Sequence, residues 1–589
     1  MKTIIERLND IVSSAFEKTG YAAKYGTVRV SDRPDLCQYQ CNGAMAAAKE
    51  YHKAPIAIAG EVAAAISVYD AFDTAEAVNP GFINMNINPE FLAGVVQEMS
   101  EDERLGVPVP EKPKMIIVDY GGANVAKPLH VGHLRPATIG ESIKRICAFA
   151  GHHVIGDVHL GDWGLQMGLI IAELRKRQPD LPYFDENYTG EWPESPPFTI
   201  TDLEEIYPAA STRSKEDEEF RSEAEENTRK LQENYEPYMA IWRHIMKVSV
   251  EDLRRNYDRL DVHFDLWKGE SDVESYIPDM VEDLKAKGLA HESDGALVVD
   301  VTEESDRKEL PPCIILKSNG ATLYATTDLA TIIEREKLYK PDQMVYVADK
   351  RQALHFTQVF RVAKKAGLLG RDTELTHIGF GTMNGPDGKP FKTRDGGILR
   401  LEELQRQIVD EVREKMRENR DYDEEELNEI SEKVGLAALK YGDLSNQASK
   451  DYAFDIERFA SFEGNTGPYI LYTIVRIGSV IKKFVDEGGE IDEDEPLLPP
   501  VTESESDLYR TIAGFPEMID SAYRELAPHK VCQYVFTLAD ALNHFYHETK
   551  IVSEPDRERR NSYLRLIGLV KRVLEKGIEL IGFSAPEKM

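Results

Sequence analysis

The chain has 589 residues and a mass of 66.5 kDa, more than one hydrophobic core supports, so we expect several domains. Hydrophobic residues make up 42% and charged residues 30%, which is typical of a globular protein. Apolar runs stay below the roughly 18 residues of a membrane-spanning helix, so we expect no membrane association and a cytoplasmic location. The five cysteines are odd in number and scattered, which favours reduced thiols and no structural metal.

The formal net charge of −33 argues against a nucleic-acid partner, because a polyanion is repelled at long range by such a surface. A local basic strip could still contact a phosphate backbone. One candidate runs from Glu548 to Lys576, where eight Lys and Arg outnumber five Asp and Glu. The charge is therefore a warning against RNA binding rather than proof against it.

The first part of the chain predicts an N-terminal domain over residues 1–110, closed by a Pro-rich linker at 107–114. A strand-like run at 115–120 follows and ends at a Gly-Gly pair. Apolar residues spaced 4, 3 and 4 apart then predict a helix up to Gly151, and a second strand-like run covers 153–158. Strand, helix and strand within about 45 residues form one βαβ unit of a parallel sheet.

A second βαβ unit is predicted further along the chain. Residues 344–347 and 376–382 are strand-like, and residues 355–366 between them have a helical pattern. Two such halves indicate an α/β fold with a doubly wound, Rossmann-type parallel sheet in a domain over 111–400. We expect a mainly helical insertion at about 165–310.

The remaining chain, residues 401–589, has a helical pattern almost to its end. We expect a helical stem followed by an all-helical C-terminal domain. One apolar face is clear from the spacing of Ile567, Val570, Leu574, Ile578 and Ile581.

The segment DYGGANVAKPLHVGH, residues 119–133, follows the first predicted strand. In a doubly wound sheet, ligands bind beyond the carboxyl ends of the strands. His130 and His133 fall where the helix begins, and unpaired N–H groups and the helix dipole favour anions there. Two imidazoles at this position can donate to phosphoryl oxygens while charge develops at an α-phosphorus, and Gly132 leaves room for a flat purine. We predict a nucleotide site; the alternative is a structural histidine pair.

A second cluster, GPDGKPFKTRDGG at 385–397, combines glycines with Lys389, Lys392 and Arg394. A cationic loop after the last sheet strand suits a departing pyrophosphate, whose charge it can neutralise. Taken alone, the loop could equally be a solvated basic turn. Together with HVGH it predicts a two-part ATP site.

These two clusters resemble the HIGH and KMSKS signatures of class I aminoacyl-tRNA synthetases. Other runs are similar to the arginyl-tRNA synthetase family in particular, and they span nearly the whole chain: QCNGAM (40–45), NPGFIN (79–84), HLGDWGLQMG (159–168), LYATTDLA (323–330) and EGNTGPY (463–469). The resemblance implies a class I catalytic domain between an N-terminal domain that binds the tRNA elbow and a C-terminal domain that binds the anticodon.

The activity implied by the resemblance is the ligation of arginine to tRNA. L-Arginine would react with ATP to give arginyl-adenylate and pyrophosphate, and the arginyl group would then move to the 3′ end of tRNA(Arg) with release of AMP. Mg²⁺ would accompany ATP. We expect the chain to act as a monomer and, like the family generally, to need tRNA before it activates arginine.

The resemblance assigns ATP binding to His130, Gly132, His133, Lys389 and Lys392. Of these, His130, His133 and Lys392 would be catalytic. The counterpart of KMSKS is degenerate, but Lys392 keeps its second lysine. Whether Lys389 or Lys127 shares this role stays open.

An arginine-binding pocket is also implied. A planar guanidinium is matched by paired carboxylate oxygens. Asp119 and Asp328 correspond to the family's guanidinium-binding positions, with Tyr324 covering the same group. The α-amino and carboxylate groups would be held by Asn124, His159 and Gln352.

Contacts with tRNA are expected in both terminal domains. Phe82 could stack on an extruded base, although it could equally be a core residue beside a turn. The positions that correspond to tRNA-contacting residues of the family are Asn79, Phe82, Asn84, Tyr469, Tyr472 and Met589.

Three other functions fit part of the sequence. A nucleotidyltransferase would share the HxGH motif but would leave the N-terminal domain and the helical tail unexplained. A tRNA-binding paralogue without catalysis would be expected to have lost His130, His133 or Lys392, and all three are present. A synthetase for another amino acid fits less well, because Asp119 and Asp328 together favour a cationic substrate.

Overall fold

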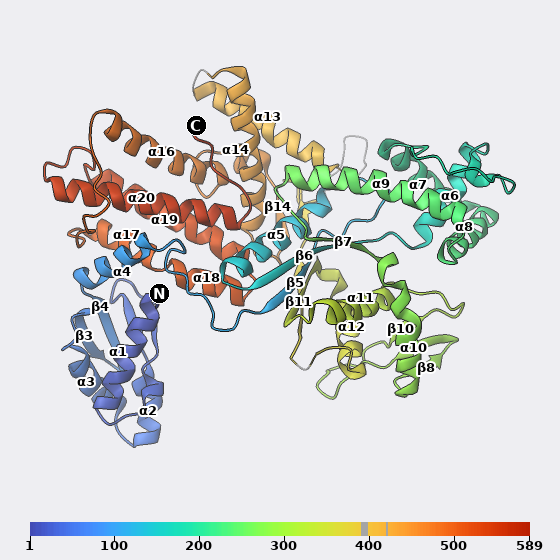
Figure 1. The fold of residues 1–589 in the computed structure, drawn as a ribbon. Helices are drawn as coiled ribbons and strands as arrows, with labels where there is room; N and C mark the ends of the chain where they lie inside the picture. Colours follow the sequence, from blue (N-terminus) through green and yellow to red (C-terminus); the bar gives the residue numbers. More distant parts are fainter. Residues whose placement is uncertain (371, 390–398, 420–421) are drawn as a thin grey trace. The chain divides into compact units, whose positions relative to one another are not determined.

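The structure is a computed structural model, and it describes residues 1–589 except 371, 390–398 and 420–421. The chain divides into two compact units, each of which is described by itself (Figure 1). The first unit contains Met1–Glu111, Ser461–Leu580 and Ser584–Met589. The second contains Lys112–Ala460 and Ile581–Phe583.

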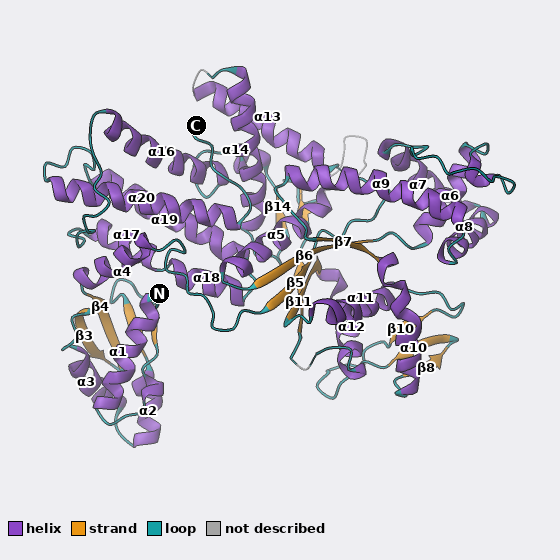
Figure 2. Ribbon diagram, viewed as in Figure 1, coloured by secondary structure: helices purple, strands orange, loops and turns teal. Residues whose placement is uncertain are grey.

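The second unit is built on a five-stranded parallel sheet in the order β12-β11-β5-β6-β7 (Figure 2). Its strands are β5 (Met115–Asp119), β6 (His153–Leu160), β7 (Leu266–Gly269), β11 (Gln343–Asp349) and β12 (Glu374–Phe380). Helix α5 (Leu134–Phe149) connects β5 to β6, and α12 (Ala353–Ala366) connects β11 to β12. Both predicted βαβ units are therefore confirmed.

The chain between the two βαβ units was expected to be mainly helical, but it also contains strands. It forms α6 (Leu165–Arg177), α7 (Ile200–Glu216), α8 (Glu218–Gln232), α9 (Glu236–Arg259) and α10 (Ile277–Ala286). A small antiparallel sheet joins β8 (Ala290–Ser293), β9 (Ala296–Val299) and β10 (Cys313–Leu316). Strand β7, which was not predicted from the sequence, pairs with β6 at the edge of the main sheet. Four residues are too few to establish a strand period.

The second unit continues beyond the sheet with a stem. Helix α11 (Tyr324–Tyr339) precedes β11. After β12 come the short strand β13 (Met383–Asn384), α13 (Leu401–Asn419) and α14 (Glu424–Leu444). Strand β14 (Tyr452–Ala453) then pairs in parallel with β13, and α15 (Ile456–Phe459) ends the stem.

The beginning of the first unit is an α+β fold. Its antiparallel sheet has the order β1 (Val28–Val30), β2 (Tyr39–Cys41), β4 (Phe82–Ile87), β3 (Phe72–Val78). The accompanying helices are α1 (Ile4–Lys18), α2 (Gly43–Tyr51), α3 (Pro55–Ile66) and α4 (Pro89–Glu101). Along β4, Ile83 and Met85 are fully buried while Phe82 and Asn84 are half-buried. One face of the sheet therefore belongs to the core and the other is open.

The end of the first unit is all-helical, as predicted. It contains α16 (Gly467–Asp486), α17 (Glu503–Ala513), α18 (Phe515–Arg524), α19 (Pro528–Glu548) and α20 (Arg557–Leu580). The predicted apolar face of α20 is buried, including Ile567, Val570 and Leu574. Within the described part of the chain, no helix is both long and apolar enough to cross a membrane.

Candidate functional site

The turn after β5 brings the ends of two neighbouring strands together. Gly121 and Gly122 have φ values of +89° and +50°, a left-handed conformation that glycine adopts readily. The turn leads to Asn124, which forms a β-bridge with Gly161 directly after β6. A Cβ on Gly161 would lie 2.2 Å from Asn124 Oδ1, so a side chain here would displace the amide of Asn124. The segments after β5 and β6 thus meet at the sheet edge where such folds bind ligands.

The HVGH histidines begin the helix, as predicted, and each is held by a backbone N–H. Residues Val131–His133 form a 3₁₀ turn that leads directly into α5. The Gly132 N–H donates to His130 Nδ1 at 3.0 Å, and the His130 N–H donates to His133 Nδ1 at 3.1 Å. An accepting Nδ1 carries no proton, so each neutral ring carries its proton on Nε2. Both imidazoles therefore present an Nε2–H donor on the far side of the ring.

Both rings are also uncharged at neutral pH. Burial, with smaller contributions from His130 and Lys127, lowers the pKa of His133 to about 3. Burial and Lys127 also lower the pKa of His130. The pair can therefore act as neutral hydrogen-bond donors to developing negative charge, and not as cations.

Gly132, between the two histidines, has no room for a side chain because the ring of His130 lies close to it. A Cβ on Gly132 would lie 2.7 Å from His130 Cε1 and 2.9 Å from its Nδ1. Such a contact is too short, so a side chain here would displace the ring of His130. The suggestion that Gly132 makes room for a purine stays a prediction.

The HVGH turn is joined through the backbone to residues that follow the second predicted cluster. The Val131 N–H donates to Leu399 O at 3.1 Å. The Leu401 N–H donates to Leu129 O at 3.0 Å. The chain just after the second cluster therefore lies beside the HVGH turn, although Leu399 comes 268 positions after Val131 in the sequence.

The near end of the same cluster follows β13. The Gly385 N–H donates to Lys389 O at 2.7 Å, and the Lys389 N–H donates to Asp387 Oδ1 at 3.0 Å. Residues Gly385–Lys389 thus form a turn directly after the strand. Lys392, the predicted catalytic lysine, lies outside the described residues.

Asp328 lies on α11 and contacts a histidine. Its Oδ2 is 2.5 Å from His355 Nε2. Tyr324, one turn earlier on the same helix, is 69% exposed, so its ring is accessible to a ligand. Gln352 ends the short turn after β11 and is exposed. Because β11 and β5 are adjacent in the sheet, this group lies at the same carboxyl edge as Asn124.

Asp119, at the end of β5, already binds a guanidinium of the chain itself. Its Oδ2 accepts from Arg335 Nη2 at 2.6 Å, and the same nitrogen donates to Asp157 Oδ2 at 2.7 Å. Burial raises the pKa of Asp119, while Arg335 and His159 oppose this rise. This ion pair was not predicted from the sequence, because Arg335 and Asp119 are 216 residues apart.

His159, on β6, lies close to this pair. Its Nε2 is 3.4 Å from Thr331 Oγ1. Among the described residues its buried Nδ1 has no hydrogen-bond partner, so this atom remains for a ligand or for water. Together with Asp119 and Asn124, His159 places three predicted residues at the ends of two adjacent strands.

Glu270 is an acid of this site that the sequence analysis missed. Burial raises its pKa to about 7, and Asp162 and Asp328 add to the effect. Although most of the Tyr324 side chain is exposed, partial desolvation of its hydroxyl and the nearby Glu270 raise its pKa. We call Asp162, Glu270 and Asp328 the acid cluster. A cation bound there would relieve the repulsion among these carboxylates. The one signal in the sequence was the position of Glu270 directly after β7, a strand too short to recognise.

In the first unit, two predicted tRNA contacts share the open face of β4. Phe82 and Asn84 are both half-buried, and Asn79 before the strand is exposed. Gln40 Nε2 donates to Asn84 Oδ1 at 3.0 Å. Phe82 therefore lies beside polar side chains on the open face and not in the core.

The other predicted tRNA contacts lie on α16 and at the C-terminus. Tyr472 is 45% exposed, whereas Tyr469 is half-buried and accepts a hydrogen bond from Asn543. Met589 is half-buried. One turn beyond Tyr472, Arg476 lies over the ring of Tyr546 at 4.1 Å from the ring centroid. This cation–π pair, which the sequence analysis missed, extends the α16 surface with planar groups on which bases could stack.

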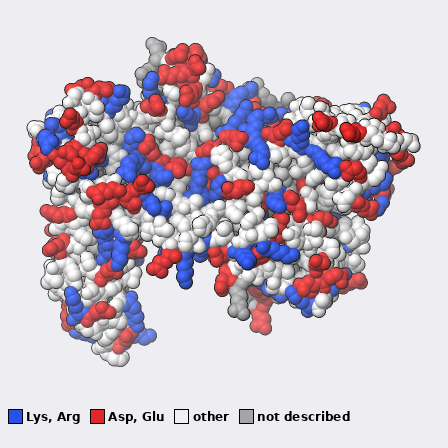
Figure 3. Space-filling model, viewed as in Figure 1, with Lys and Arg blue, Asp and Glu red and all other residues white. Residues whose placement is uncertain are grey.

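The basic strip at 548–576 is largely used within the unit itself. Lys571 Nζ lies 2.7 Å from Glu575 Oε1, and Arg572 Nη1 donates to Ser100 O at 2.6 Å. Acidic and basic side chains are also intermixed over the face shown in Figure 3.

Within the described residues, no group of three or more His, Cys, Asp or Glu could hold a metal ion.

Three known families match successive parts of the chain. Residues 2–87 match the arginyl-tRNA synthetase N-terminal domain, and residues 95–456 match the catalytic domain of the class I (R) tRNA synthetases. Residues 470–589 match the DALR anticodon-binding domain. The catalytic-domain match alone covers more than half of the chain.

Individual relatives match over the whole length. The chain is 57% identical to an arginine–tRNA ligase of Agathobacter rectalis and 55% identical to one of Alkaliphilus oremlandii, with 100% of each chain covered. The crystal structure of an arginyl-tRNA synthetase from Plasmodium falciparum has a TM-score of 0.82 at 24% identity, with both chains fully covered. That of Thermus thermophilus has a TM-score of 0.79 at 22% identity over 100% of both chains. The two structures have the same fold as this chain.

Proposed function

The chain belongs to the arginyl-tRNA synthetase family and ligates arginine to tRNA, and we propose that the chemistry takes place at the carboxyl edge of the five-stranded sheet. L-Arginine reacts there with ATP to give arginyl-adenylate and pyrophosphate. The arginyl group then passes to the 3′ end of tRNA(Arg), and AMP is released. The observation that carries this placement is a pair of neutral histidine donors at the same sheet edge as the acid cluster.

In the first step, a carboxylate oxygen of arginine attacks the α-phosphorus of ATP, and the bond to the bridging oxygen of pyrophosphate breaks. ATP enters as its Mg²⁺ complex. The Nε2–H groups of His130 and His133 donate to phosphoryl oxygens, and their hydrogen bonds strengthen as negative charge grows in the transition state. Lys389 and Lys392 neutralise the departing pyrophosphate. The histidines transfer no proton in this step, so catalysis comes from positioning and electrostatics.

For the amino acid, we propose that different carboxylates bind the guanidinium and the α-amino group of arginine. The resemblance assigns the guanidinium to Asp119 and Asp328. Arg335 already occupies Oδ2 of Asp119, so we assign the substrate guanidinium to Asp328 and Glu270, with Tyr324 covering it. Asp119 then faces the α-amino cation through Oδ1. The remaining contacts to the α-amino and carboxylate groups come from Asn124, His159 and Gln352.

The tRNA is proposed to contact both ends of the first unit. The anticodon would lie on the surface of α16, where Arg476 and Tyr546 extend the predicted residues. We further propose that the chain acts in the cytoplasm as a monomer. The proposed contact residues are Asn79, Phe82, Asn84, Tyr469, Tyr472 and Met589.

An aminoacylation assay with each of the twenty amino acids and bulk tRNA tests the assignment of the site. The wild-type chain is expected to charge tRNA with arginine alone. Asp328→Ala is expected to raise the KM for arginine while leaving the KM for ATP unchanged. An unaltered KM for arginine in this variant would show that the acid cluster does not bind the substrate.

A further inference from the structure

Arg135 is a buried arginine two residues after HVGH, and neither the sequence nor the family resemblance assigned it a role. Its side chain is 2% exposed, and its Nε donates to Asp443 Oδ1 at 2.9 Å. Asp443, near the end of α14, is completely buried. A buried ion pair of this kind adds little net stability, because its desolvation offsets much of the attraction. Its value must therefore be sought in the geometry that it imposes.

The same guanidinium binds two further segments of the chain. Arg135 Nη1 donates to Gly381 O at 2.8 Å and to Lys450 O at 3.0 Å. Gly381 lies two residues before β13, and Lys450 lies two residues before β14. A Cβ on Gly381 would lie 2.5 Å from the carbonyl group of Lys450, so the two segments are as close as a glycine allows.

Asp443 is itself fixed on both of its oxygens. Thr138, one turn after Arg135 on α5, donates through Oγ1 to Asp443 Oδ2 at 2.7 Å. Tyr452 in β14 donates through its hydroxyl to Asp443 Oδ1 at 2.8 Å. The ring of Tyr452 also lies 5.0 Å from the guanidinium carbon of Arg135. Helix α5, the end of α14 and the β13–β14 pair therefore meet in one buried polar cluster.

This cluster lies between the two parts of the proposed ATP site. His133 is two residues before Arg135, at the start of the same helix. On the other side, β13 leads directly into the Gly385–Lys389 turn. One side chain thus connects the histidines with the strand from which Lys389 extends.

We propose that Arg135 is a positioning residue that holds the HVGH histidines and the Lys389 turn at the spacing required by the triphosphate of ATP. This inference rests on the proposed function of the two clusters. The role suits arginine and not lysine, because a planar guanidinium offers several donors in a rigid arrangement. Here it reaches Asp443, Gly381 and Lys450 at once, whereas an ammonium group would lose part of this set.

Arg135→Lys tests the proposal, because it keeps the charge but not the arrangement of donors. We expect its KM for ATP in aminoacylation to rise about tenfold, while the KM values for arginine and tRNA stay within about twofold of wild type. Thr138→Val is the matched control. It removes a hydrogen bond to the same Asp443 from the same helix, touches neither Gly381 nor Lys450, and should leave the KM for ATP unchanged.

If Arg135 had a merely structural role, Arg135→Lys would lower the melting temperature and the fraction of active enzyme. The KM values for ATP, arginine and tRNA would then all stay at their wild-type values. That result, or equal KM values for ATP in the two variants, would overturn the proposal. If Arg135→Lys does not fold, Asp443→Asn replaces it, since it keeps an oxygen acceptor for Nε. It must raise the KM for ATP more than Thr138→Val does, and equal values would again overturn the proposal.

His133→Asn separates this inference from the function on which it rests. If that variant keeps wild-type turnover, the proposed ATP site itself is wrong. If its turnover falls while Arg135→Lys leaves the KM for ATP unchanged, only the positioning role is wrong.

Discussion

Arg335 Nη2 lies 2.6 Å from Asp119 Oδ2, so the protein holds an arginine side chain of its own at the sheet edge proposed to bind substrate arginine. The resident guanidinium is 1% exposed and also binds Asp157. It fixes the orientation of Asp119 and offsets part of its charge. The Asp119 carboxylate can then bind the α-amino group of arginine, and its reduced charge makes it less attractive to other cations.

Asp119→Asn should therefore raise the KM for arginine about tenfold, because it removes the charge that faces the α-amino group. The matched control is Asp157→Asn, which weakens the same ion pair from the other side. It should lower the melting temperature with little change in that KM. Steady-state aminoacylation and thermal unfolding of both variants test this, and equal KM values would contradict the assignment of Asp119.

Glu270 makes arginine binding sensitive to pH. Its pKa of about 7 means that the carboxyl group is largely protonated below pH 7 and charged above it. A guanidinium binds the charged form more tightly, so the KM for arginine should fall as pH rises from 6 to 8. Glu270→Gln should flatten this part of the profile.

Glu282→Gln, at an exposed position on α10, is the control for that measurement and should keep the wild-type dependence. The arginine KM would be measured at constant ionic strength for all three proteins. A profile of Glu270→Gln that follows the wild type would remove Glu270 from the site.

His133 is predicted to act through a neutral Nε2–H. His133→Asn keeps a short polar side chain but removes this donor, and kcat should fall by about 10²-fold or more. Because its pKa is about 3, the ring stays neutral across the working range, and its protonation should not shape the wild-type kcat profile between pH 5.5 and 8. A pH profile in which kcat requires a protonated His133 would contradict the neutral-donor mechanism.

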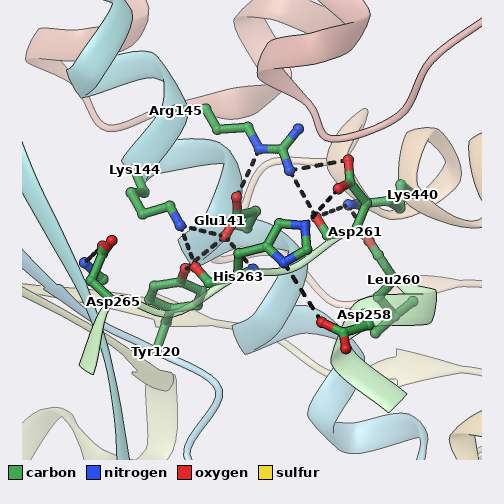
Figure 4. A network of polar contacts seen from close by, with 11 residues as sticks. Tyr120, Glu141, Lys144, Arg145, Asp258, Leu260, Asp261, His263, Asp265 and Lys440 are labelled. Carbon is green, nitrogen blue, oxygen red and sulfur yellow. Dashed lines mark hydrogen bonds and ion pairs between the residues drawn. The ribbon is translucent and has the colours of Figure 1, made fainter. Parts of the chain in front are cut away.

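Lys440 should make the stability of the fold depend on pH. Figure 4 shows its ammonium beside the carbonyl groups of Leu260 and Asp261, and the Asp261 oxygen accepts at 3.2 Å. Burial lowers the pKa of Lys440 to about 7; Arg145 and Lys144 also lower it, and Asp261 and Glu141 oppose them.

In the unfolded chain this lysine has an ordinary pKa of about 10.4. Between pH 7 and 10 the unfolded state therefore binds more protons at Lys440, and the free energy of unfolding should rise with pH because of this residue. Urea unfolding from pH 7 to 9 should show a smaller rise for Lys440→Met than for wild type. Lys433→Met, at a half-buried position on the same helix, should follow the wild type. Identical slopes for all three proteins would refute the shift.

Local patterns in the sequence were sufficient to predict the helices and strands that carry the site. The strand-like run 115–120, the helix up to Gly151 and the position of HVGH between them follow from periodicity and glycine breakers within short segments. The same holds for the second βαβ unit and for the helical tail. These signals depend on neighbours a few residues apart, so the sequence alone determined the catalytic fold and the nucleotide motif.

What the tertiary structure decided depends on residues that are distant in the chain. Arg135 and Asp443 are 308 residues apart, and Arg335 and Asp119 are 216 apart. Only packing brings Glu270 near Asp328, and burial together with nearby charges moves a carboxyl or ammonium pKa to about 7. Desolvation and Coulomb energies depend on distances in space, and the spacing of residues in the sequence does not give these distances. The sequence therefore identified the chemistry, whereas the fold decided which charged groups face the substrate and which ones hold the site in place.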